Sequence, residues 1–169
     1  MSPPARRRVD SATALLRTYS ASARINQYLV ERLDPAVWRA AVRGNDGKQM
    51  RTIAALVAHL HNCGLRYLVR TEPAATVPPE LDRLRVTPAQ AVRALGAKRR
   101  AVLRIVGAAL AEGRRIVGFP HDAANYLAYY AVHDGHHRGQ IVMLARLLGH
   151  PIGQDTMSGM WQWTKRAGE

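Results

Sequence analysis

Apolar residues recur at alternating steps of three and four along four long segments of the chain, and most prolines and glycines fall between these segments. This spacing places the apolar side chains on one face of an α-helix. No stretch shows the two-residue alternation of a half-buried strand, and no internal repeat is visible. The pattern predicts an all-α four-helix bundle, with helices over about residues 10–33, 50–70, 88–112 and 122–148.

Signals at the ends of these segments support the helices. Thr87, Pro88 and Gln90 match a capping box with proline in the first turn, which predicts the start of the third helix. Asp122 is a candidate N-cap for the fourth helix, and Gly149 follows its last turn. Both helices are therefore expected to have sharp ends.

The segment after the fourth helix contains Trp161 and Trp163, and two indoles so close together favour burial. We expect this short C-terminal segment to fold back and cap the bundle. A chain of 169 residues fits one domain around one core, so residues 1–169 are expected to form a single domain. Residues 1–9 are expected to form a flexible, basic N-terminal tail.

The charge balance is strongly basic, with 25 lysines and arginines against 12 acidic residues and a net charge of +13. Such a surface can attract nucleic acid, anionic lipid or acidic metabolites. The basic residues are scattered singly, however, and the one run is Arg6–Arg8. This pattern favours solvated helix faces, with a nucleic-acid-binding face as the alternative.

Cys63 is the one cysteine, so an intrachain disulfide is excluded and a reducing compartment is favoured. The N-terminal residues lack the apolar stretch of a secretory signal, and no uncharged apolar segment of about 18 residues could span a bilayer. These observations predict a cytoplasmic protein with no membrane partner.

The fourth helix carries the strongest candidate for chemistry. One of its faces is expected to present Tyr126, Tyr130, His133, His137 and Gln140. Histidines four residues apart lie about 6 Å from each other, so His133 and His137 can share one metal ion. Because a lone inward-facing histidine is usually a core residue, a metal site requires support from a third ligand. The second helix offers His59 and His61, and apolar periodicity does not choose between them.

Residues 133–141, with the sequence HDGHHRGQI, the earlier Ala58-His59 segment and the closing GMWQW of residues 159–163 together resemble the DinB/YfiT-like superfamily of metal-dependent enzymes. The resemblance spans nearly the whole chain. It implies a four-helix bundle of DinB/YfiT-like topology, often dimeric, with a divalent ion such as zinc or nickel held by three histidines. By position these ligands are His59, His133 and His137. His61 is then a neighbour, and His136 faces the outer flank of the bundle.

Three histidine ligands leave coordination positions open, which is typical of catalytic sites, because structural zinc prefers four protein ligands. An open position can hold water or a substrate thiolate or oxygen. The resemblance implies thiol-dependent S-transferases that use low-molecular-weight thiols, and a small-molecule hydrolase fits the same ligands. The leading hypothesis is a homodimeric enzyme of one of these types. The alternatives are a non-catalytic, stress-related or nucleic-acid-binding module that uses the arginine-rich surface, and a bundle whose core histidines bind no ion.

Five further residues have two interpretations each. Tyr126 and Tyr130 either line a substrate cavity or fill the aromatic core. Gln140 either orients a bound molecule or packs in the core with a hydrogen bond. Asp134 either acts as the general base of an HExxH-type protease, or is a hydrogen-bond acceptor or a solvent-facing residue. Cys63 either approaches the ion or is a small core residue.

Overall fold

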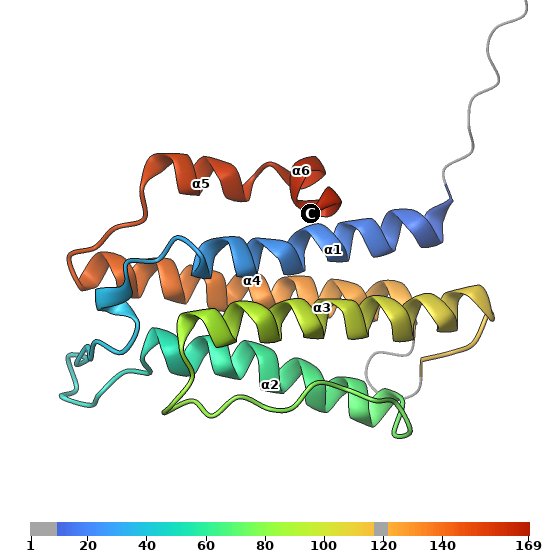
Figure 1. Cartoon of the computed structure of the whole chain (residues 1–169), viewed down its shortest axis with the longest axis horizontal. Helices are drawn as coiled ribbons and strands as arrows, with labels where there is room; N and C mark the ends of the chain where they lie inside the picture. Colours follow the sequence, from blue (N-terminus) through green and yellow to red (C-terminus); the bar gives the residue numbers. More distant parts are fainter. Residues whose placement is uncertain (1–9, 117–121) are drawn as a thin grey trace, which may run out of the picture.

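The computed structural model describes residues 10–116 and 122–169, and four long helices run side by side in it (Figure 1). They are α1 (Ser11–Val30), α2 (Ile53–Thr71), α3 (Pro88–Ala111) and α4 (Ala123–Leu147). A 3-10 helix, η1 (Pro35–Val37), follows α1. Within the described ranges the β-type pairing is limited to one isolated bridge, between Arg43 and Gln49. The predicted all-α fold is thus confirmed, while the expected tail of residues 1–9 lies outside the described residues.

Local capping explains where the helices begin. The Thr87 hydroxyl accepts a hydrogen bond from the Gln90 amide at 3.2 Å, and the Gln90 side chain accepts one from the Thr87 amide at 2.9 Å, which confirms the capping box. Asp122 caps α4 by accepting from the Asn125 amide at 2.8 Å. α2 begins at Ile53 and not at the predicted residue 50, because the Thr52 side chain caps it.

The apolar core has two clusters, one at each end of the bundle, and a polar layer lies between them. The first cluster includes Leu29, Leu60, Leu95 and Ile141, and the second includes Ala23, Leu65, Val102 and Tyr130. On each helix a buried polar side chain falls between members of the two clusters. These side chains are Asn26, His61, Lys98 and Asp134.

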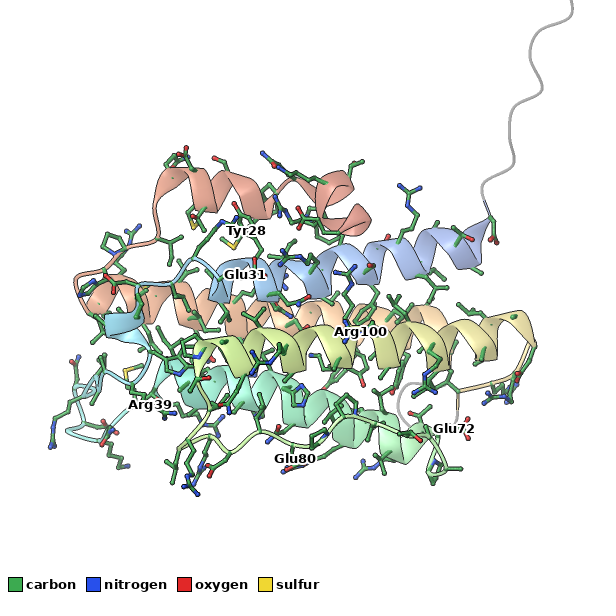
Figure 2. All side chains as sticks on the ribbon, viewed as in Figure 1. Tyr28, Glu31, Arg39, Glu72, Glu80 and Arg100 are labelled. Atoms are coloured by element: carbon green, nitrogen blue, oxygen red, sulfur yellow. The ribbon has the colours of Figure 1, made fainter. Side chains whose placement is uncertain are left out.

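The C-terminal segment forms two short helices, α5 (Gln154–Met160) and α6 (Trp163–Gly168), which fold back along α1 (Figure 1). Tyr28 of α1 lies beneath this segment (Figure 2), and the Arg166 guanidinium carbon is 4.0 Å from its ring centroid. Arg166 is 4% exposed, whereas Trp161 is 77% exposed. The expected burial of both indoles is therefore wrong for Trp161, and the contact with the Tyr28 ring is made by Arg166 of α6.

A glycine allows this close contact between α5 and α1. A Cβ atom at Gly159 would overlap the hydroxyl oxygen of Tyr28, whereas one at Gly153 would meet nothing within 4 Å. Gly159→Ala should therefore lower the free energy of unfolding by about 1–3 kcal/mol through overpacking, and Gly153→Ala should change it little. Thermal unfolding of the two variants compares them. Equal melting temperatures would contradict this close packing.

None of the helices in the described part of the chain has both the length and the apolar character needed to cross a membrane.

Candidate metal centre

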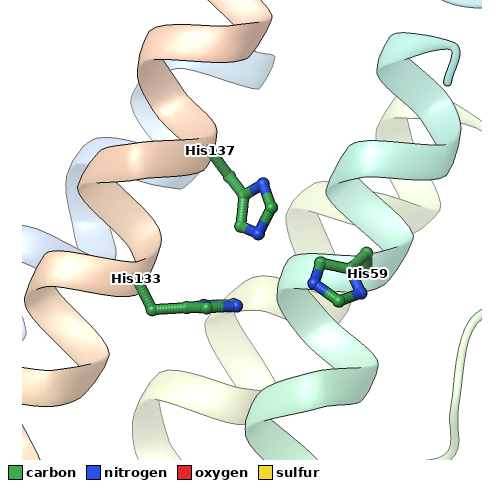
Figure 3. Close-up of side chains that lie close together, drawn as sticks. All are labelled: His59, His133 and His137. Carbon is green, nitrogen blue, oxygen red and sulfur yellow. The ribbon is translucent and has the colours of Figure 1, made fainter. Parts of the chain in front are cut away.

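Three histidines face one another between α2 and α4 (Figure 3). His59 comes from α2, and His133 and His137 come from successive turns of α4. The ring centroids are 5.5 Å apart for His59 and His133, 4.7 Å for His59 and His137, and 4.6 Å for His133 and His137. One nitrogen from each ring lies within 4.8 Å of the other two. The structure thus brings the three predicted histidines together.

The spacing and chemistry of these nitrogens fit one divalent ion. Two nitrogens that bind the same ion at roughly 2.1 Å can be at most about 4.2 Å apart. Since the three nitrogens lie within 4.8 Å of one another, a small closing movement of the rings is enough to reach that spacing. Neutral imidazoles are good ligands for zinc and nickel.

Burial keeps two of the rings in the neutral form that a metal requires. Burial, followed by the nearby imidazoles of His137 and His133, lowers the pKa of His59 to about 4. Burial also lowers the pKa of His137, and this effect outweighs the opposing hydrogen bond to Gln140. His59 and His137 therefore carry free lone pairs at neutral pH.

Gln140 determines which nitrogen of His137 carries the proton. Its side-chain oxygen lies 2.7 Å from His137 Nδ1, and its side-chain nitrogen lies 3.1 Å from His136 Nε2. The amide oxygen can only accept, so His137 Nδ1 donates and His137 Nε2 is left as the ligand atom. Gln140 is exposed and does not pack in the core. The amide nitrogen of Gln140 faces the exposed His136 ring.

A buried carboxylate lies behind His133. Asp134 Oδ1 is 3.6 Å from His133 Nδ1, which is too long for a hydrogen bond but close enough for an electrostatic contact. Asp134 is 1% exposed, so the solvent-facing alternative is wrong. Its other oxygen accepts from Asn26 Nδ2 at 2.6 Å and lies 3.6 Å from Lys98 Nζ. The carboxylate is therefore held between α1, α3 and the His133 ring.

The charge on Asp134 is maintained by its neighbours. Burial alone would raise the pKa of this carboxyl, but Lys98, the contact with His133, Arg138 and Asn26 together lower it below its usual value. Lys98 is itself 1% exposed and donates to the carbonyl oxygen of Leu60 at 3.0 Å. The sequence reasoning names no buried cation on α3 and therefore misses Lys98. Because a buried carboxylate needs a compensating positive charge, the burial of Asp134 is the feature that points to a buried cation opposite it.

His61 and Cys63 lie near the centre but have other surroundings. His61 is fully buried, and its Nε2 donates to the carbonyl oxygen of Pro79 at 2.9 Å. It therefore anchors the connection between α2 and α3. Cys63 is half-buried, and burial raises the pKa of its thiol. Among the described residues, the group that could share an ion contains the three histidines and neither of these two.

The tyrosines of α4 lie on two sides of the helix. Tyr126 and Tyr130 are buried in the second apolar cluster, and Tyr130 donates to the carbonyl oxygen of Gly64 at 2.6 Å. Tyr129 stacks on His133 with ring centroids 6.0 Å apart, and its hydroxyl is 2.9 Å from that of Tyr67. Sequence reasoning missed Tyr129, although its position one turn before His133 was a signal.

A cavity of about 710 Å³ opens beside the histidines, between the start of α2 and α4. His136, His137 and Gln140 line it on the α4 side, and Arg51 lines it on the α2 side. Of the three histidines, His137 lines this cavity, so a small molecule bound there would lie next to the His137 ring.

Comparisons with known proteins agree with this architecture. A sequence model of the DinB family matches residues 9–167, nearly the whole chain. No curated protein and no solved structure gives a match. With a family match of this extent over an all-helical fold, the chain belongs to the DinB family.

Proposed function

We propose that this protein is a cytoplasmic, metal-dependent enzyme that acts on a small molecule. His59, His133 and His137 would hold a divalent ion, zinc or nickel, and the reaction would be transfer of a low-molecular-weight thiol or hydrolysis. The observation that carries the proposal is the convergence of three histidine nitrogens within 4.8 Å of one another, next to an open cavity.

The donor set favours catalysis over a purely structural ion. Structural zinc sites usually have four protein ligands, and this group has three. A divalent ion held by these histidines would polarise a substrate oxygen and would keep a thiol deprotonated at neutral pH.

The surrounding residues would orient the ligands. Gln140 holds the His137 ring through Nδ1, which leaves His137 Nε2 for an ion, and the buried carboxylate of Asp134 lies 3.6 Å from His133 Nδ1. His137 and Gln140 line the cavity, so a substrate bound there would lie beside the His137 ring.

Metal analysis tests the proposal. The protein is purified without chelators, dialysed with zinc, nickel or cobalt, and analysed for metal by mass spectrometry. We expect one tightly held ion per chain, and the absence of saturable binding for all three metals would overturn the proposal. Absorption of the cobalt form then separates the reactions, because a thiol such as 2-mercaptoethanol should produce a sulfur-to-cobalt charge-transfer band if the site serves thiol transfer.

The oligomeric state is part of the same proposal. α4 exposes Val132 and Leu147, whose exposed fractions are 72% and 58%. Such side chains suit burial against a second copy of the chain. Light scattering coupled to size-exclusion chromatography should report the mass of a homodimer.

A further inference from the structure

The cavity beside His137 has the size of a small-molecule site. Its volume of about 710 Å³ falls within the range of roughly 300–1,000 Å³ that is usual for ligand pockets. It is formed where the residues preceding α2 meet the last three turns of α4. Because His137 lines this cavity, the chemistry of its wall is informative about the substrate.

Most of the wall is apolar. Met50 and Met143 are 41% and 56% exposed, and Leu56 and Leu144 lie beneath them as part of the first apolar cluster. Exposed methionines at the rim of a pocket can adapt to the shape of an alkyl chain. The wall therefore favours a molecule with a hydrocarbon body.

The charged side chain that lines the cavity is positive. Arg51 lines the cavity, and no acidic residue is among the described residues that line it.

Arg51 differs from the arginines that are neutralised elsewhere on the surface. Arg24, Arg66 and Arg114 each pair with a glutamate at 3.1 Å or less. No described carboxylate lies within ion-pair distance of Arg51. Its guanidinium therefore retains its capacity to bind a carboxylate or a phosphate.

We propose that this cavity binds a small amphipathic anion, with its carboxylate or phosphate group on Arg51 and its alkyl body against Met50 and Met143. This inference extends the proposed function by naming the chemical class of the substrate. The binding step itself depends on the cavity wall and not on the metal, so the two can be tested separately.

Calorimetric titration of the zinc-loaded and the metal-free protein tests the inference. The probes are octanoate and octyl phosphate, with acetate as the anion that lacks a chain and octylammonium as the chain of opposite charge. Octanoate or octyl phosphate should bind measurably, whereas acetate and octylammonium should not. Whichever of the two anions binds more tightly identifies the head group.

Two variants and one control variant locate the binding. Arg51→Gln should weaken octanoate binding about tenfold or more, because a charge-assisted hydrogen bond is lost. Arg70→Gln changes an exposed arginine at the far end of α2 and should have no effect. Met143→Gln should reduce the difference in affinity between octanoate and acetate. Arg51 and Met143 are both exposed, so these variants should keep the wild-type melting temperature.

Equal binding of octanoate to the wild type and to Arg51→Gln would overturn the inference, as would equal binding of octanoate and octylammonium. Metal content is measured on the same samples. Loss of metal binding with retained octanoate binding would count against the proposed function alone, and retained metal without octanoate binding would count against this inference alone.

Discussion

His137→Ala should abolish stoichiometric metal binding while leaving the helical fold intact. The substitution removes one of three ligands, so we expect an affinity loss larger than the roughly 10–100-fold cost of losing a residue that only orients a ligand. His137 lies in the middle of α4, and alanine is the better helix former. Zinc bound after dialysis against a competing chelator and far-ultraviolet circular dichroism give the two measurements.

A neighbouring histidine provides the matched control. His136 lies on the same turn of α4 and is exposed, and it is not among the three histidines whose nitrogens lie within 4.8 Å of one another. His136→Ala should therefore retain one ion per chain. If His137→Ala also retained one ion, the assignment of the three histidines as ligands would be wrong.

Lys98→Met should lower the free energy of unfolding by about 3–5 kcal/mol, the usual cost of removing one partner of a buried ion pair. Lys98 and Asp134 are each 1% exposed, with Nζ and Oδ2 3.6 Å apart. Without the ammonium group, the carboxylate would remain buried with only Asn26, His133 and Arg138 to balance it. Chemical denaturation of the metal-free protein measures the difference.

The pH dependence of this loss has a defined sign. The folded-state pKa of Asp134 is lowered, so its stabilising contribution is present above the unfolded value near 3.8 and is lost as pH falls through the folded value. Removal of Lys98 should raise that folded pKa, because burial would then dominate. The destabilisation of Lys98→Met should therefore be largest at neutral pH and should shrink on acidification.

Two further variants test the pairing itself. Lys48 is 86% exposed and only 3.7 Å from the exposed Asp46, so Lys48→Met should change stability by less than about 0.5 kcal/mol. The double variant Lys98→Met with Asp134→Asn should be less destabilised than the sum of the two single variants, by about 1 kcal/mol or more. Strict additivity would show that Lys98 and Asp134 do not act as a pair.

The helices and half of the candidate site follow from the sequence by itself. Capping boxes and apolar periodicity are local properties, because each involves residues within one or two turns of the same helix. For this reason Thr87 marks the start of α3, and His133 and His137 necessarily lie on one face of α4. Their separation of four residues was enough to predict a shared direction.

Only the tertiary structure decided which residues meet across the bundle. His59 and His61 are equivalent in the apolar pattern of α2, and the family resemblance alone singled out His59. In the structure, docking against α4 turns His59 toward His133 and directs His61 to the carbonyl of Pro79. Lys98 is buried because α3 meets Asp134 of α4 at that position. Contacts between distant segments depend on the rotation and depth of helix packing, which a single helix pattern specifies only to within a broad apolar stripe.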